Sequence, residues 1–393
     1  MTALADIWGI NEAQFWLREG LPEHKVRYDE PTGVWDVFGY PEIQQAITDP
    51  STFSSNSQRL TPNADQRPSE GVLTQLDPPE HQKLRKLVSH AFTPKVVADL
   101  EPRITELTNE LLDGMSGRTE LVEDLAYPLP VIVIAELLGV PAADRTLFKQ
   151  WVDSMFTTSD RFSLKERAAE QEEYLAKALE DVEQLTDYLR EHIRERRAKP
   201  REDLLSKLVR AEVDGQRLTD EEVANFGLVL LVAGHITTTM LLGNTLLCLD
   251  AHPEQFARVR TDRSLTPSAI EESLRFLSPF AATARSTTRE TELAGQTIGA
   301  DQLVLLWLAA GNRDPRQFTD PDVFDVTRDP NPHLAFGRGI HFCVGAPLAR
   351  LEGRVALNLI MDRFPDLRTD PEAPPVFMPN PNMTGIRELP LLL

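Results

Sequence analysis

Apolar residues recur every three to four positions through much of the chain, which predicts a mainly helical protein. The pattern runs from about residue 100 to residue 208, with interruptions near Pro128–Pro130 and Pro141 and strongly charged faces between the apolar positions. We interpret one run of mixed charge, Arg194–Arg197, as a solvated helix face. A last helix is predicted over Ala346–Phe364, where four apolar residues share one side: Leu348, Leu351, Val355 and Leu359.

The longest apolar stretch, Val223–Leu249, is predicted to be a helix at the centre of the fold. It contains no charged residue and follows Thr219 and Glu222, whose spacing is that of a capping box. With an end near His252 the helix has about 30 residues and is therefore about 45 Å long. Such a length also suits a membrane span, but the stretch carries polar side chains, has acidic flanks and lacks aromatic or basic anchors. We therefore expect a buried helix that crosses the domain.

Short extended segments predict small β-sheets beside the helices. They cover four stretches: Gly33–Tyr40, Thr283–Thr287, Glu292–Ile298 and Leu303–Leu308. The polar stretch Ser51–Gly71 is predicted to be a loop and is a candidate lid. A helix is expected to begin at Asp77, because prolines and a capping-box acid follow it, and this helix places His81 and Arg85 on one face.

The overall charge and the cysteine count narrow the classes of partner. With 41 basic and 61 acidic residues the formal net charge is −20, which disfavours nucleic acid and anionic membranes as partners. Cys248 and Cys343 have no CxxC spacing, so we expect neither a disulfide framework nor a zinc site. The N-terminus lacks a basic segment followed by an apolar one, and therefore reads as neither a signal peptide nor an anchor. These features together favour a cytoplasmic protein.

The segment from Phe336 to Gly345 predicts a thiolate site at Cys343. Its glycines, which include Gly337, allow a tight turn beneath a flat ligand, and the N-terminus of the following helix stabilises negative sulfur. Phe336 and Phe342 are placed to shield the sulfur from water. A buried, inert cysteine is the alternative that this segment leaves open when it is taken alone.

The same segment, FGRGIHFCVG, resembles the cysteine-loop signature of the cytochrome P-450 superfamily, FGxGxHxCxG, at every fixed position. The resemblance implies haem b as the cofactor, Cys343 as the axial ligand of its iron, and insertion of oxygen into a substrate, since an electron-rich thiolate favours cleavage of the O–O bond. It also implies a single domain over residues 1–393 with no fused reductase. The fold of that family is mainly α with small β-sheets, and its long central helix lies over the haem.

Other segments resemble further parts of the same family. Glu272 and Arg275 look like its ExxR pair, and Arg328 matches the arginine that completes that buried network. Two haem carboxylates that enter an apolar pocket require basic or donor partners. Four residues match the family's partners for these propionates: His81, Arg85, Arg285 and His341. His333 matches no fixed position of the family, and we assign it no role.

The stretch Ala233–Thr238 resembles the family's oxygen-binding groove, [AG]Gx[DE]T[TS]. This implies that Ala233 borders the haem and that Thr237 is catalytic. His235 lies about 200° around the helix from Thr237, so we interpret it as a buried histidine with a local hydrogen bond that faces away from the iron. The family usually has an acid before the threonine, and this chain has Ile236. The departure leaves haem binding unaffected and removes the carboxylate of the usual proton relay.

The resemblance further implies separate electron donors, a ferredoxin and its NAD(P)H-dependent reductase, together with dioxygen and a small apolar substrate. We expect a macrolide or another secondary metabolite to be hydroxylated or epoxidised. Five residues are predicted to line its pocket: Phe226, Leu230, Ala282, Thr283 and Met383.

Two alternatives stay open. A peroxygenase would take oxygen from peroxide, which the missing acid at position 236 favours and the lack of an arginine on the oxygen-facing stripe opposes. A haem carrier or gas sensor would bind haem without turnover. An electron carrier of that kind needs a second strong axial ligand, and the stripe has none.

Overall fold

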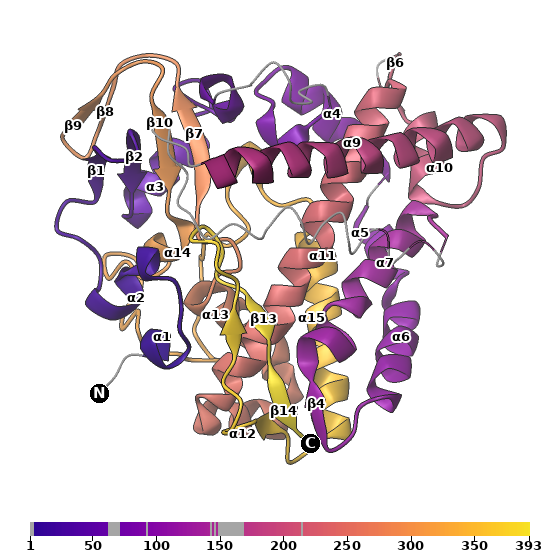
Figure 1. Ribbon diagram of the computed structural model, residues 1–393, viewed down its shortest axis with the longest axis vertical. Coiled ribbons are helices and arrows are strands. Elements are labelled where there is room, and N and C mark those ends of the chain that lie inside the picture. Colours follow the sequence, from indigo (N-terminus) through magenta and orange to yellow (C-terminus); the bar gives the residue numbers. More distant parts are fainter. Residues whose placement is uncertain are drawn as a thin grey trace.

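The computed structural model describes residues 4–61, 71–91, 93–141, 144, 147, 169–213 and 215–393. Most of its helices lie on one side of the molecule and its largest sheet on the other (Figure 1). The α-helices are α1 Leu4–Ile7, α2 Trp16–Glu19, α3 Tyr40–Thr48, α4 Glu80–Ala91, α5 Pro94–Ala98, α6 Glu101–Asp113, α7 Pro128–Leu138, α9 Ala169–Ala198, α10 Leu204–Arg210, α11 Asp220–Asp250, α12 Pro253–Thr261, α13 Thr266–Phe276, α14 Leu308–Gly311 and α15 Ala346–Arg363. Single helical turns are η1 Glu12–Gln14, η2 Ser57–Leu60, η4 Leu73–Gln75, η5 Val122–Ala126, η8 Arg263–Leu265 and η9 Gly339–His341.

The strands form one mixed sheet and several small antiparallel ones. The strands are β1 Val26–Asp29, β2 Val34–Val37, β3 Phe53–Ser54, β4 Arg118–Glu120, β5 Glu212–Val213, β6 Gln216–Arg217, β7 Thr283–Thr287, β8 Thr291–Leu293, β9 Gln296–Ile298, β10 Leu303–Leu306, β11 Arg368–Thr369, β12 Val376–Phe377, β13 Ile386–Glu388 and β14 Pro390–Leu392. The largest sheet has the order β1-β2-β10-β7-β3 and is antiparallel except between β2 and β10. The smaller sheets are β11-β14-β4, β12-β13, β5-β6 and β8-β9.

The predicted central helix is α11, and the other long helices pack around it. Its capping box is present, because the Glu222 N–H donates to Thr219 Oγ1 at 3.0 Å and the Thr219 N–H donates to Glu222 Oε2 at 2.8 Å. It contacts α7, α9, α13 and α15 and runs through the middle of the molecule (Figure 1). Its polar residues bond within the protein: Asn244 Nδ2 donates to Leu277 O at 2.9 Å and to Thr384 O at 2.7 Å. α11 is long and apolar enough to cross a membrane, and 72% of its most apolar window is buried inside the protein, as expected of a core helix.

The start of the chain is tied to the hairpin near its end. Gln14 in η1 is fully buried, and its Nε2 donates to Pro381 O at 3.3 Å and to Met383 O at 3.1 Å. Its Oε1 accepts a hydrogen bond from Thr384 Oγ1 at 2.6 Å. The loop between β12 and β13, which contains Met383, is therefore held by a residue more than 360 positions earlier.

Several predicted boundaries differ from the structure for local reasons. α4 begins at Glu80 rather than Asp77, because the Asp77 carboxylate binds the preceding loop instead of capping the helix: it accepts from Ser54 Oγ and from the Ser55 N–H. The segment predicted as one strand, Glu292–Ile298, is the hairpin β8–β9, which turns at two residues of positive φ.

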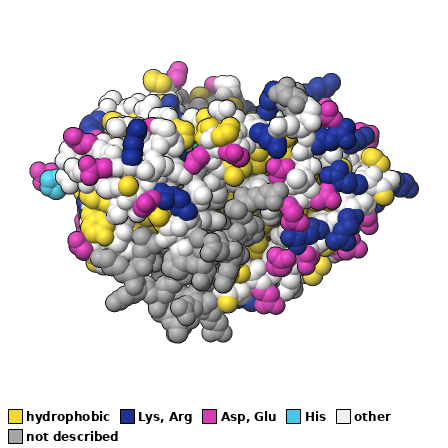
Figure 2. All heavy atoms as spheres, turned by 90° about the horizontal axis from the view of Figure 1, so that it is seen from above, with side chains coloured by type: hydrophobic (Ala, Val, Ile, Leu, Met, Phe, Trp, Pro, Cys, Tyr) yellow, Lys and Arg dark blue, Asp and Glu magenta, His cyan; other side chains and the backbone are white. Residues whose placement is uncertain are grey.

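The prediction that the run Arg194–Arg197 is a solvated helix face is wrong for one of its residues. Arg196 is fully buried and its Nε donates to Asp203 Oδ2 at 2.9 Å, while Nη2 donates to Gly139 O at 2.5 Å. The end of α9 is thereby joined to the end of α7 and the start of α10. On the part of the face in Figure 2 that the structure describes, basic and acidic side chains are interspersed.

Candidate functional site

The cysteine loop leads from irregular chain into the first turn of α15. Gly337 and Gly339 have φ of 66° and 67°, a conformation that residues with side chains rarely adopt. The Cys343 N–H donates to Phe336 O at 2.9 Å and closes the loop. Because α15 begins at Ala346, the cysteine lies directly beside the N-terminus of a long helix.

Several nearby groups favour negative charge on the sulfur of Cys343. Burial raises the pKa of the thiol, and against this effect the backbone N–H groups of Gly345 and Ala346 lower it. The positive charges of Arg85 and Arg350 also lower this pKa. Donors and cations that converge on the sulfur of a half-buried cysteine suit a thiolate bound to a metal ion, whose own charge offsets the cost of burial.

Four basic side chains converge from α4, β7 and the cysteine loop. The rings of His81 and His341 lie 4.2 Å apart, and His341 Nε2 lies 2.8 Å from Ser55 Oγ. Arg285 is 6% exposed, and burial lowers its pKa to about 10. Burial and the charges of Arg285, His81 and Arg85 lower the pKa of His341 to about 3. Within the described part of the chain, no ion pair joins Arg85 or Arg285 to a carboxylate.

α11 has an uncovered face at its middle. Ala233 is exposed and Val229 and Thr237, four residues away on either side, are half-buried, although most of this helix is buried. Thr237 Oγ1 donates to Ala233 O at 2.6 Å, and Thr238 Oγ1 donates in the same way to Gly234 O at 3.0 Å. An open face lined by small residues gives a planar ligand room to approach the helix.

His235 lies on the opposite, buried side of α11, as expected from its helical position. It is 3% exposed, and its Nδ1 lies 3.1 Å from Leu231 O, to which it can only donate. The Tyr127 ring meets it edge-on at 5.1 Å. Burial lowers the pKa of His235 to about 4, so the ring is neutral at pH 7.

The three predicted network residues form one buried cluster. Arg275 Nε and Nη2 each donate to the Glu272 carboxylate at 2.8 Å, and both side chains are fully buried. Arg328 Nε donates to both oxygens of Glu272 at 3.2 Å. Arg275 also donates to three backbone carbonyls, at Asn312, Pro321 and Val323. One carboxylate and two guanidinium groups thus tie α13 to the irregular chain before the cysteine loop.

A model of the cytochrome P450 family matches residues 27–393. The chain is a cytochrome P450. The cyclomarin C epoxidase of Salinispora arenicola is 45% identical to this P450 over 379 residues, which cover 95% of this chain and 94% of that protein. The erythromycin C-12 hydroxylase of Saccharopolyspora erythraea is 43% identical over 397 residues, which cover 100% and 94%. The crystal structure of HmtT, which is involved in himastatin biosynthesis, is 58% identical, has a TM-score of 0.90 and covers both chains completely.

These matches confirm the predicted family, fold class, cofactor and activity. The P450 is a haem-dependent monooxygenase, an oxidoreductase that uses dioxygen. As a bacterial-type member of the family it requires electron-donor proteins besides its substrate and dioxygen.

The residues of the site fit a haem. His81 is only 1% exposed, and among the described residues neither of its ring nitrogens has a hydrogen-bond partner. Buried polar groups are rarely left unpaired, so this ring lacks an acceptor or donor that a ligand supplies. Together with His341 it supplies neutral hydrogen-bond donors beside the two guanidinium cations of Arg85 and Arg285, and this group suits two propionates. Cys343 and the open face of α11 suit the iron and the ring.

The five residues predicted to line the substrate pocket do not share one apolar cluster, and they differ in exposure. Met383 is 3% exposed and packs with Ile236 and Met240 in one apolar cluster beside Thr237. Thr283 is half-buried, and Ala282 is 7% exposed in a cluster of aromatic residues. Phe226 and Leu230 lie in the main core at 1% and 8% exposure. The uncovered stripe of α11 therefore includes Val229 rather than these two residues.

Sequence reasoning missed one cluster of polar side chains beside the cysteine loop, of which His333 is buried and Glu271 and Arg350 are partly exposed. His333 Nε2 lies 3.0 Å from Glu271 Oε2, and Glu271 accepts two hydrogen bonds from Arg350, at 2.6 and 2.7 Å. These hydrogen bonds, from Arg350 first and then His333, outweigh burial and lower the pKa of Glu271 to about 2. The one signal in the sequence was the lone His333 just before the motif. The cluster forms part of the wall of a hollow of about 500 Å³ on this side of the protein.

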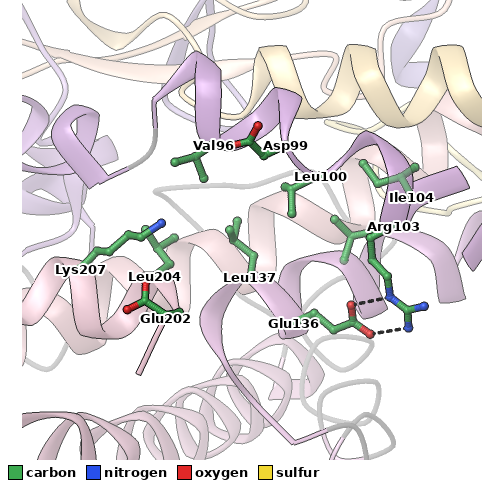
Figure 3. A pocket seen from close by; sticks show the side chains of 11 residues that line it. Val96, Asp99, Leu100, Arg103, Ile104, Glu136, Leu137, Glu202, Leu204 and Lys207 are labelled. Atoms are coloured by element: carbon green, nitrogen blue, oxygen red, sulfur yellow. Dashed lines mark hydrogen bonds and ion pairs between the residues drawn. The ribbon is translucent and has the colours of Figure 1, made fainter. Parts of the chain in front are cut away.

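A second hollow, of about 310 Å³, lies between α5, α6, α7 and α10 (Figure 3). Arg103 on its rim donates to both oxygens of Glu136 at 3.0 Å, which joins α6 to α7. No predicted site residue lines this hollow. We interpret it as a surface depression between helices.

Proposed function

We propose that this P450 hydroxylates or epoxidises a macrolide-like secondary metabolite, with electrons from a ferredoxin and its NAD(P)H-dependent reductase, in the cytoplasm. The observation that carries the proposal is that relatives covering nearly the whole chain include an epoxidase and a hydroxylase, named for cyclomarin C and erythromycin. An apolar cluster of Ile236, Met240 and Met383 beside Thr237 supports an apolar substrate. We further propose that residues 1–393 act as one domain.

In this proposal each group of residues has a distinct task. Cys343 ligates the iron, and the basic cluster of His81, Arg85, Arg285 and His341 binds the propionates. Bound haem supplies the activation of dioxygen. The Thr237 hydroxyl releases its hydrogen bond to Ala233 O and instead holds a water molecule through Oγ1. This water passes protons to dioxygen at the open face of α11. His235 takes no part, because it is neutral and lies on the buried side.

Coupling between electron use and product tests the proposal. With ferredoxin, reductase and NAD(P)H, we expect the wild-type protein to form product. Thr237→Ala should lower product per NAD(P)H about tenfold and raise the release of hydrogen peroxide, because the water loses its anchor. Thr238→Ala is the matched control, since its hydroxyl makes the same kind of bond one residue later but is buried. Its coupling should stay close to that of the wild type.

The same assay separates the alternatives. Product with hydrogen peroxide alone and none with NAD(P)H would identify a peroxygenase, which the aliphatic Ile236 at the acid position favours. Haem binding with no product under either condition would identify a carrier or sensor. Unchanged coupling in Thr237→Ala would show that protons reach the site by another route.

Electron delivery is proposed to use the cysteine-loop face. Arg350 and Arg354 on this face are paired with Glu271 and Glu101, which reduces the positive charge that these two residues contribute. Arg338 instead donates to Tyr40 Oη and Pro332 O and makes no ion pair within the described residues. It is therefore the cation best able to meet an acidic partner.

Charge reversal at this residue tests that surface. Arg338→Glu should slow reduction by an acidic ferredoxin about tenfold at low salt, because steering between opposite charges raises association rates. Salt should slow the wild type as the Debye length falls from about 10 Å at 0.1 M to about 3 Å at 1 M. Reversal of the exposed Arg368 on β11 should have no such effect. Equal reduction rates in both variants would exclude this docking surface.

A further inference from the structure

The cluster of His333, Glu271 and Arg350 joins three separate parts of the chain beneath the cysteine loop. His333 belongs to the irregular chain before the loop, Glu271 to α13 and Arg350 to the second turn of α15. His333 is 8% exposed, and the Arg350 guanidinium binds both oxygens of Glu271. The proposed catalytic steps use none of these three residues.

A chain of hydrogen bonds leads from this cluster to the cysteine. The Ala335 N–H donates to His333 Nδ1 at 3.2 Å, so the hydrogen bonds assign the ring proton to Nε2, which donates to Glu271. Phe336 follows Ala335 directly, and its carbonyl accepts the Cys343 N–H at 2.9 Å. His333 is thus hydrogen-bonded to the residue next to the peptide that holds the backbone of Cys343.

The aromatic ring of Phe336 is fixed by the same cluster. The Arg350 guanidinium lies 4.6 Å from the centre of this ring, within the range of a cation–π contact. The His333 ring lies 6.0 Å from it and the Phe342 ring 6.3 Å from it. The charge of Arg350 near the sulfur is therefore held in place by Phe336 on one side and balanced by Glu271 on the other.

We propose that the His333–Glu271–Arg350 cluster positions the cysteine thiolate and sets the net charge beside it, and that His333 is the positioning residue that links the two tasks. This inference rests on the proposed role of Cys343 as the haem ligand. A thiolate that is held by its backbone stays on the iron. A balanced charge beside it fixes how readily the haem accepts an electron, because reduction adds negative charge.

Two variants are expected to shift the reduction potential in opposite directions. His333→Phe keeps an aromatic ring but removes the hydrogen bond that the neutral imidazole donates to Glu271, so the negative charge of Glu271 is less stabilised and less dispersed. The ratio of ferrous to ferric haem at a fixed potential should therefore fall about tenfold, equal to about 59 mV for one electron. Glu271→Gln keeps the size of the side chain and leaves the charge of Arg350 unbalanced, so the same ratio should rise. Loss of structure alone would move both variants in the same direction.

Spectroscopy and a conservative variant complete the test. In His333→Phe the reduced carbon monoxide complex should lose its thiolate absorption band about tenfold faster than in the wild type, because the cysteine loop has lost a support. His333→Gln should recover most of both properties, since its amide donates to Glu271 and accepts from Ala335. His252→Phe is the control, because His252 is a half-buried histidine whose Nδ1 also makes one backbone contact, to Cys248 O at 2.7 Å.

The measured potentials and spectra distinguish failure of this inference from failure of the proposed function. Wild-type potentials in both variants, or shifts of the same sign, would overturn the inference alone, provided that the wild type has the thiolate band. A wild-type protein that lacks this band would overturn the proposed function and the inference with it. Shifts of the reduction potential in opposite directions, with recovery in His333→Gln, would establish that the cluster positions the thiolate and sets the charge beside it.

Discussion

Replacement of Cys343 with alanine is expected to abolish the red-shifted absorption band of the reduced carbon monoxide complex. That band requires a thiolate on the iron, and an alanine side chain cannot ligate a metal. The backbone of the loop should survive, because its closing hydrogen bond uses the N–H of residue 343 and not the side chain. The measurement is the absorption spectrum of haem-loaded, dithionite-reduced protein under carbon monoxide.

The second cysteine provides a control of the same chemistry. Cys248 is fully buried in α11, and burial raises the pKa of its thiol to about 12, so it stays protonated. Cys248→Ala should therefore keep the band at full strength, with a modest loss of stability from the small cavity. A thiolate band that persisted in Cys343→Ala, or vanished in Cys248→Ala, would contradict the assignment of the ligand.

The buried network around Glu272 should give the largest effect on stability. Glu272→Gln leaves the Arg275 guanidinium fully buried without a counter-charge, and Arg328 loses the same partner. Removal of one partner from a buried ion pair typically costs about 3–5 kcal/mol. We expect a decrease of this size in the free energy of unfolding, measured by denaturant titration, together with weaker retention of haem.

A surface pair of the same spacing is the matched control. Arg103 and Glu106 also lie three residues apart on a helix, but both side chains are partly exposed. Glu106→Gln should change the free energy of unfolding by about 0–1 kcal/mol, as is usual for exposed pairs. Equal effects of Glu272→Gln and Glu106→Gln would show that burial of the network does not matter for the fold.

The parts of the site that the sequence could predict are those encoded in short segments. The cysteine loop, the pair of Glu272 and Arg275 and the threonine of α11 each sit within a few residues of their defining neighbours. The capping box at Thr219 is equally local and begins α11 as predicted.

The remaining features depend on partners that are distant in the sequence. Glu271 meets His333 across 62 positions and Arg350 across 79, so no local pattern reveals the cluster. Arg196 looked solvated because its own helix is highly charged, whereas its burial comes from Asp203 and the Gly139 carbonyl. A helical wheel likewise gives the faces of α11 but not which face its neighbours leave open.

The bond between Gln14 and the loop that carries Met383 has a practical consequence for engineering. The N-terminal segment of a protein is often truncated or fused to a purification tag, on the assumption that it lies far from the active site. Here such a change would act on the wall of the predicted substrate pocket, through the three hydrogen bonds of one glutamine side chain. Libraries that aim to alter substrate range should therefore include the neighbourhood of Gln14.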